Sequence, residues 1–283
     1  MSTHNIDDQS PYGTFATGAF ANRLLSVTRS LPTSWLGRRA MFIIRRLARR
    51  SIGAVCDTEL FGARLRMYSQ GNVSEKRALY APQFFDLEER QALRDLAEDN
   101  AVFIDIGANI GLYSFSTAAA FKQHRNTRII AVEPHPVISK RLAYNLSLNP
   151  EMPIEPMVMA LGDRDGHMTL VSSTDNLGES RLLQSDETAD NDTVEVPVKT
   201  LLGLLEAQKV ERLDGMKIDI EGYEEAVLTP FFEQAPEALL PRLIIIEKNL
   251  EQWKTDLIKL AAKRNYKSVK TTGINLMLER VKD

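Results

Sequence analysis

The sequence predicts an α/β protein with a doubly wound, mostly parallel sheet and a small extension of helices and strands at its N-terminus. Short apolar segments alternate with segments of helical periodicity from residue 101 onward. The first apolar segment, 101–106, is nearly continuous, as strands covered on both faces are, and it leads into a turn with two glycines. Alternation of strand and helix implies right-handed crossovers between parallel strands.

The elements expected along the chain follow from periodicity and turn residues. The expected helices are 35–50, 86–95, 112–121, a helix that begins near Pro136, and 251–264. The expected strands are a pair within 57–69 that turns at Phe61-Gly62, then 101–106, 128–132, 157–161, 168–171, 194–198, 216–220, 243–246, 267–270 and 276–281. The polar stretch 172–192 is expected to form a loop. Asn265 suits the left-handed cap of the last helix.

Length and charge bound the class of protein. The chain has 283 residues, of which 43% are hydrophobic and 26% charged, as in ordinary globular proteins. Residues 1–50 hold eight arginines and two aspartates, a net charge of +6, which leaves −9 for the other 233 residues of a chain whose formal charge is −3. Binding to a nucleic-acid backbone needs a basic surface. We therefore expect no nucleic-acid partner.

The N-terminal part is expected to differ from the rest of the chain. Residues 1–33 are rich in serine and threonine and predict a poorly ordered leader. We divide the chain into a basic extension, 1–56, partly disordered and then helical, and a main domain, 57–283. The apolar runs are too short to cross a bilayer, we see no secretory signal, and Cys56 is the only cysteine. These features favour a reducing, cytoplasmic location.

The segment 35–50 combines an apolar stripe, formed by Leu36, Ala40, Ile43 and Leu47, with six arginines and no acidic residue. Three interpretations remain open for it. The helix packs on the acidic body, or it makes a peripheral contact with an anionic membrane surface, or it belongs to an organelle transit peptide.

The turn after the first apolar strand carries candidate ligand-binding residues: Asp105, Gly107, Asn109 and Gly111. In doubly wound sheets, nucleotide-like ligands lie beyond the carboxyl ends of the strands. A dinucleotide fingerprint requires glycine at the positions of Asn109 and Leu112, so the loop is poorly suited to a pyrophosphate. A carboxylate beside the glycines suits a ligand with an ammonium group and a sulfonium, such as S-adenosyl-L-methionine. The alternative is that these glycines serve packing alone.

Acidic residues end three further strands. Glu133 follows the second strand, where a carboxylate can accept hydrogen bonds from ribose hydroxyls. Asp219 and Glu221 end the fourth strand, with Lys217 deeper on the same side. Their i, i+2 spacing points both carboxylates the same way while the chain stays extended. They can orient or deprotonate an acceptor hydroxyl or hold a divalent cation. Glu247, after the fifth strand, is a weaker candidate. The alternative for each is an ordinary exposed strand end.

Histidines offer no metal site. His124, His135 and His167 fall in separate loops, and no pair has the spacing of metal ligands, so we assign no metal. We interpret His135 as a solvated loop residue and Asn145 as a structural residue on the inner face of its helix.

Five motifs occur in order along the chain: F-I-D-I-G-A-N-I-G at 103–111, V-E-P at 132–134, N-L-S-L-N at 145–149, A-L-G-D at 160–163 and K-I-D-I-E-G at 217–222. In their order and rough spacing the chain resembles the FkbM-type methyltransferases over about residues 57–283. The resemblance implies a class I fold with a seven-stranded sheet whose last strand is antiparallel. It also implies S-adenosyl-L-methionine as the cofactor and O-methylation of a hydroxyl on a sugar, glycolipid or other natural product.

The same resemblance implies roles for individual residues. The cofactor-binding residues are Asp105, Gly107, Asn109, Gly111 and Glu133, and the catalytic residues on the acceptor side are Asp219 and Glu221. The chain departs from the family at Leu202-Gly203, where members often carry Asp-Asp, and at Asn265, where they carry glycine. The expected partner is a small-molecule or glycan hydroxyl acceptor.

Other classes of protein compete with this interpretation. A non-catalytic binding module of the same fold has no need to keep Asp105, Glu133 and Asp219 together. An NAD-dependent oxidoreductase is disfavoured because the loop lacks the required glycines. Amine methylation of nucleic acid is disfavoured because the fourth strand lacks an Asn/Asp-Pro-Pro-aromatic turn and the body is acidic.

Overall fold

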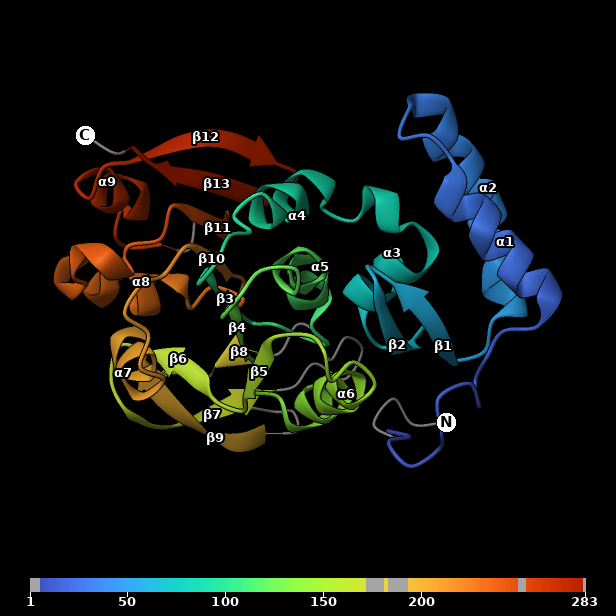
Figure 1. The fold of residues 1–283 in the computed structure, drawn as a ribbon, viewed down its shortest axis with the longest axis horizontal. Coiled ribbons are helices and arrows are strands. Elements are labelled where there is room, and N and C mark those ends of the chain that lie inside the picture. Colours follow the sequence, from blue (N-terminus) through green and yellow to red (C-terminus); the bar gives the residue numbers. More distant parts are fainter. Residues whose placement is uncertain (1–5, 172–180, 183–192, 249–252, 282–283) are drawn as a thin grey trace.

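The computed structural model describes residues 6–171, 181–182, 193–248 and 253–281. Its centre is a seven-stranded sheet in the order β12-β13-β11-β10-β3-β4-β5 (Figure 1). The strands are β3 (Val102–Ile106), β4 (Arg128–Val132), β5 (Ile154–Met157), β10 (Gly215–Ile218), β11 (Leu243–Glu247), β12 (Tyr266–Thr272) and β13 (Asn275–Arg280). Neighbours from β11 to β5 pair in parallel, whereas β13 runs antiparallel to β11 and β12. The predicted sheet with an antiparallel last strand is confirmed.

Helices cover both faces of this sheet. One face packs on α4 (Leu87–Arg94), α5 (Leu112–Phe121) and α6 (Pro136–Ser147), and the other on α7 (Leu201–Ala207), α8 (Glu224–Gln234) and α9 (Leu257–Ala262). Successive strand residues enter opposite cores: Phe103 and Ile129 pack with the first set of helices, and Ile104 and Ile130 with the second. Burial on both faces explains why these strands are continuously apolar in the sequence.

A smaller, separate sheet has the strand order β6-β9-β7-β8. Its strands are β6 (Ala160–Gly162), β7 (Gly166–Val171), β8 (Arg181–Leu182) and β9 (Thr193–Thr200). The single strand expected at 157–161 is therefore wrong, because this apolar run is divided between β5 and β6. Val158, which is 54% exposed, lies where the chain leaves the first sheet. Most of the loop expected at 172–192 lies outside the described residues.

The N-terminal part contains more structure than its composition suggests. Its elements are α1 (Ala19–Ser30), α2 (Trp35–Ser51), β1 (Val55–Leu60), β2 (Ala63–Tyr68), α3 (Val73–Tyr80) and the 3-10 helix η1 (Pro82–Phe84). The predicted β pair and the helix at 35–50 are confirmed, but the poorly ordered leader expected over 1–33 is wrong where α1 forms. Ala21 and Leu25 of α1 are buried in the same core as Leu65. Arg29 also donates a 3.0 Å hydrogen bond to the carbonyl oxygen of Leu79.

Other differences concern helix positions. The helices α3, α7 and α8 were not expected, and a further 3-10 helix, η3, spans Glu237–Leu239. Within the expected helix 251–264, α9 begins only at Leu257, after Asp256 caps it by accepting a hydrogen bond from the amide of Lys259. Residues 251–252 lie outside the described part. Asn265 has the expected left-handed conformation, with φ of 66°. No helix in the described ranges is long and apolar enough to cross a membrane.

Candidate active site

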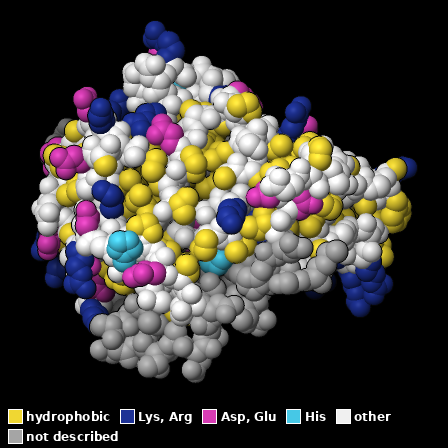
Figure 2. All heavy atoms as spheres, turned by 90° about the horizontal axis from the view of Figure 1, so that it is seen from below, with side chains coloured by type: hydrophobic (Ala, Val, Ile, Leu, Met, Phe, Trp, Pro, Cys, Tyr) yellow, Lys and Arg dark blue, Asp and Glu magenta, His cyan; other side chains and the backbone are white. Residues whose placement is uncertain are grey.

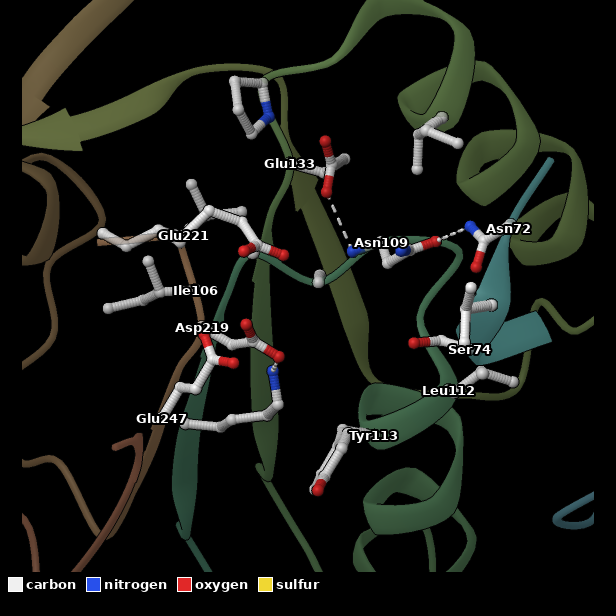
Figure 3. A pocket seen from close by; sticks show the side chains of 18 of the residues that line it. Asn72, Ser74, Ile106, Asn109, Leu112, Tyr113, Glu133, Asp219, Glu221 and Glu247 are labelled. Atoms are coloured by element: carbon white, nitrogen blue, oxygen red, sulfur yellow. Dashed lines mark hydrogen bonds and ion pairs between the residues drawn. The ribbon is translucent and has the colours of Figure 1, made fainter. Parts of the chain in front are cut away.

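The strands β3, β4 and β10 end side by side at one edge of the main sheet, because β3 pairs in register with both neighbours. Gly107, Glu133 and Asp219 follow the three strands at this edge. A cavity of about 280 Å³ opens there (Figure 3). Its wall includes the loop before α5, the segment around α3, and Glu247 at the end of β11. Ligands of doubly wound proteins bind at this edge of the sheet, so the cavity is the candidate active site.

Gly107 lies where the chain after β3 passes close to the end of β10. Its φ is 76°, and a Cβ atom there would lie 1.9 Å from the carbonyl oxygen of Asp219. The amide of Gly107 donates to the carbonyl oxygen of Val132 (3.0 Å), and that of Asp219 to Ile106 (3.1 Å). The sequence placed this glycine among the candidate ligand-binding residues, with a packing role as the alternative. The structure shows that it makes room for the backbone of Asp219.

Asp105 and Gly111 support the cavity without belonging to its wall. Asp105 is 1% exposed, and its Oδ2 accepts hydrogen bonds from the amide (3.1 Å) and hydroxyl (2.6 Å) of Ser114. Burial raises the pKa of Asp105, although Lys217 opposes the shift. Gly111 has φ of 88°, and a Cβ there would lie 2.8 Å from Cδ1 of Leu142 on α6. Both residues thus fix the start of α5, which positions the cavity loop.

Glu133 lies in the wall and is 7% exposed. Its Oε2 accepts from the amide of Asn109 and its Oε1 from the amide of His135, both at 2.9 Å. Burial raises the pKa of Glu133 to about 7, even though these two amide donors lower it. The solvated loop position expected for His135 is wrong: this residue is 3% exposed and caps α6, because its Nδ1 accepts from the amide of Val137 (3.1 Å).

Asn109 connects the loop to the N-terminal segment. Its φ is 54°, and its Oδ1 accepts a 2.7 Å hydrogen bond from Nδ2 of Asn72 (Figure 3). Asn72 is 1% exposed and caps α3 by accepting from the amide of Glu75 (3.1 Å). Asn72 was not among the site residues expected from the sequence. The signal was present, because Asn followed by Glu three residues later is typical of a helix start.

Lys217 and Asp219 form the charged part of the opposite wall. Nζ of Lys217 lies 3.1 Å from Oδ2 of Asp219 and 4.9 Å from the ring centroid of Tyr113. Burial opposes the charge of Lys217, but Asp219 and Asp105 outweigh it and raise the pKa of the ammonium group. Tyr113 donates a 3.1 Å hydrogen bond to Oδ2 of Asp86, and burial raises its pKa. Lys217 thus stays cationic and holds Asp219 in place.

Glu221 also lines the cavity, but the extended backbone expected between Asp219 and Glu221 is wrong. The strand β10 ends at Ile218, and Glu221 has φ of 53°, so the chain is not extended between Asp219 and Glu221. The turn nevertheless leaves both carboxylates in the wall, on the same side as Glu247 (Figure 3).

The cavity is rich in carboxylates. Its charged lining residues are Asp86, Glu133, Asp219, Glu221 and Glu247, with Arg77 and Lys217 as the cations. An excess of negative charge favours cationic ligands and disfavours a pyrophosphate. Among the residues that the structure describes, no group of three histidine, cysteine or acidic side chains is arranged to hold a metal ion.

Comparison with known families agrees with this geometry. Residues 105–268 match the methyltransferase FkbM domain, which therefore extends from Asp105 on β3 into β12 and contains β4, β5, β10 and β11 of the main sheet completely. The chain belongs to the FkbM methyltransferase family, as its motifs suggested. The segment with Asn72 and α3 lies outside the matched residues.

Two curated relatives are also named methyltransferases. The chain is 30% identical over 176 residues to "Methyltransferase sdnD" of Sordaria araneosa, an alignment that covers 52% of this chain and 66% of that protein. It is 26% identical over 147 residues to "Methyltransferase 1" of Beauveria bassiana (strain ARSEF 2860), covering 46% and 58%. The chain thus spans less than two thirds of the length of each relative.

Solved structures of methyltransferases show more distant likeness. The precorrin-6y C5,15-methyltransferase of Geobacter metallireducens GS-15 has a TM-score of 0.39 and 14% identity, covering 68% of this chain and 89% of that one. The M. jannaschii TYW2 structure in complex with AdoMet has a TM-score of 0.36 and 15% identity, covering 81% and 88%.

Proposed function

We propose that the chain is a cytoplasmic, S-adenosyl-L-methionine-dependent methyltransferase that methylates a hydroxyl on a sugar, glycolipid or other natural product. The observation that carries the proposal is the composition of one cavity. Its wall brings together the loop with Gly107 and Asn109, the carboxylate of Glu133, and the carboxylates of Asp219 and Glu221.

The described residues fit the proposed cofactor. Each carboxylate oxygen of Glu133 accepts one backbone amide, and each has a second lone pair for a ribose hydroxyl. The excess of carboxylates in the wall fits the sulfonium and ammonium groups of the cofactor and opposes the pyrophosphate of NAD. When bound, S-adenosyl-L-methionine supplies an electrophilic methyl group. The chain itself holds the loop around it through the bond between Asn109 and Asn72.

Asp219 marks the part of the cavity that we assign to the acceptor hydroxyl. Its side chain is 36% exposed, so it reaches the cavity, and Lys217 fixes one of its oxygens. A carboxylate held in this way can accept a hydrogen bond from an acceptor hydroxyl and take up its proton. Glu221 and Glu247 supply further acceptors for neighbouring hydroxyls, as a polyol or sugar presents. Alignment of the acceptor is the main contribution, and proton removal adds a factor of roughly 10² to 10⁴.

Transfer of a labelled methyl group tests this proposal even though the acceptor is unidentified. The protein is incubated with methyl-labelled S-adenosyl-L-methionine and a cell extract separated into small-molecule, lipid, protein and nucleic-acid fractions. We expect label in the small-molecule or lipid fraction, in a product with a new methyl ether. Label confined to protein or nucleic acid, or no transfer at all, contradicts the proposal.

Asp219→Asn separates catalysis from binding in the same assay. The substitution keeps the size of the side chain and an acceptor for Lys217, so the fold and cofactor affinity should be retained. Turnover should fall well over tenfold, because the amide is a poor proton acceptor. Asp95→Asn, at the exposed end of α4, is the matched control and should transfer methyl groups as the wild type does. Near-normal turnover in Asp219→Asn assigns this residue to structure alone.

A further inference from the structure

The helix α2 presents an apolar face that nothing in the described residues covers. Large hydrophobic side chains on it have high exposed fractions: Trp35 64%, Leu36 71%, Phe42 58%, Ile43 69% and Leu47 50%. These are five of the thirteen large hydrophobic side chains that are exposed among the described residues, so they are concentrated on one helix of 17 residues. Contiguous exposed apolar surface marks a binding surface more often than scattered residues do.

The buried side of α2 is a different one. Gly37, Met41 and Ala48 are buried, and α2 contacts α1. The apolar stripe that includes Leu36 and Ile43 therefore does not pack on the acidic body of the chain. The first of the three interpretations, in which the helix packs on the body, therefore applies to the buried side alone, where Ala48 belongs to the same core as Leu65.

Cations are interleaved with the exposed apolar residues. The helix holds six arginines and no acidic residue, and α1 also contains no acidic residue. The guanidinium of Arg39 lies 4.3 Å from the ring centroid of Trp35, and that of Arg45 lies 5.2 Å from Phe42. Figure 2 shows hydrophobic and basic side chains together at the end of the molecule that α1 and α2 form, on the right as in Figure 1.

We propose that this face of α2 binds peripherally to an anionic membrane surface. The arginine side chains are long enough to reach lipid phosphates while the apolar residues between them enter the interface. Trp35 has the amphipathic ring that favours the membrane–water boundary. A second copy of the same face is a poor partner, because two sets of six arginines would repel each other. Charge therefore selects an anionic surface rather than self-association.

The helix α2 is linked to the cavity wall through α1, which contacts both α2 and α3. Nε2 of Gln83 donates a 2.6 Å hydrogen bond to the carbonyl oxygen of Thr28 on α1, and Arg29 donates to Leu79 on α3. Ser74 and Arg77 of α3 line the cavity. The membrane contact goes beyond the proposed methyl transfer and does not depend on it, since vesicle binding is measured without cofactor or acceptor.

Sedimentation with vesicles tests the proposal on the full-length chain. We expect it to pellet with vesicles of phosphatidylcholine and phosphatidylglycerol at low salt, and less at high salt because the charges are screened. It should remain in the supernatant with phosphatidylcholine alone. Each cation near an anionic surface contributes roughly a factor of five. Replacing Arg46, Arg49 and Arg50 by Gln should therefore lower the partition coefficient on the order of 100-fold.

Two further variants make the test specific. Replacement of Arg94, Lys263 and Lys267 by Gln changes the net charge equally at exposed positions elsewhere, and should leave binding within about twofold of the wild type. A second variant, Leu36→Ser/Ile43→Ser/Leu47→Ser, keeps all the charges but removes the apolar contact. It should weaken binding at least tenfold. Circular dichroism establishes that each variant is folded.

Several results overturn the proposal. They are a full-length chain that stays in the supernatant with anionic vesicles at low salt, equal pelleting with neutral vesicles, or equal losses in the α2 variants and the control. Sedimentation velocity without lipid covers the protein alternative. A dimer that the serine variant abolishes, in a chain that does not bind vesicles, assigns the face to a protein contact instead.

Discussion

Replacing Gly107 by alanine should destabilise the protein through the contact between the β3 loop and the end of β10. A left-handed backbone costs a residue with a Cβ about 1–2 kcal/mol. The new methyl group would also lie 1.9 Å from the carbonyl oxygen of Asp219, and relief of such overpacking costs about 1–3 kcal/mol. The free energy of unfolding should therefore fall by about 2–5 kcal/mol, less than the total stability of most domains.

Gly62→Ala is the matched control for this substitution. Its φ is 77°, against 76° for Gly107, but a Cβ there meets only the Cβ of Ala119, at 3.5 Å. The backbone cost is therefore the same, and the crowding is absent. Urea unfolding of both variants measures the difference, which should be about 1–3 kcal/mol at equal m-values. Equal destabilisation of the two variants would show that Gly107 is required by its own backbone angle and not by the carbonyl oxygen of Asp219.

Two further predictions concern the cavity. Because burial raises the pKa of Glu133 to about 7, and because ribose hydroxyls bond best to the ionised carboxylate, affinity for S-adenosyl-L-methionine should increase as the pH rises through about 7. Glu133→Gln should lose this increase in affinity, which calorimetry across that pH range measures. An unchanged pH profile in the variant would show that Glu133 does not contact the ligand. Asn72→Ala should cost about 0.5–2 kcal/mol by uncapping α3 and also weaken cofactor binding by releasing Asn109. In contrast, Asn72→Asp keeps the oxygen that caps α3, so it should retain most of the stability and lose only affinity for S-adenosyl-L-methionine. Unchanged affinity in both variants would show that the Asn72–Asn109 hydrogen bond does not support the cofactor loop.

The strand ends of the site could be predicted from the sequence because they depend on local patterns. Continuous apolar segments identified β3, β4 and β10, and parallel strands place their carboxyl ends at one edge. Glu133 and Asp219 could therefore be assigned to one cavity although 85 residues separate them. The predicted position of Glu221 in the cavity wall was correct, but the extended backbone on which the prediction rested was not. A left-handed turn leaves this side chain in the wall.

Features that depend on long-range packing could not be predicted. Gly111 precedes α5 at a position where a Cβ atom would crowd Leu142 of α6, and no sequence pattern links these two residues. Periodicity also located α2 correctly but not its buried side. A Cβ at Gly37 would lie 1.9 Å from the carbonyl oxygen of Pro32, so the preceding turn packs on that side. The stripe with Leu36 consequently faces outward.

The most direct test of the proposed function is calorimetry with S-adenosyl-L-methionine, its demethylated product and NAD, on the wild type and on Glu133→Ala. We expect the wild type to bind the first two ligands and not NAD. Loss of the Glu133 carboxylate should weaken the binding of both ligands by about 1–3 kcal/mol, or about 5- to 150-fold, because their ribose hydroxyls lose a hydrogen-bond acceptor. Binding of NAD but not of S-adenosyl-L-methionine, or equal affinity in Glu133→Ala, would contradict the proposed function.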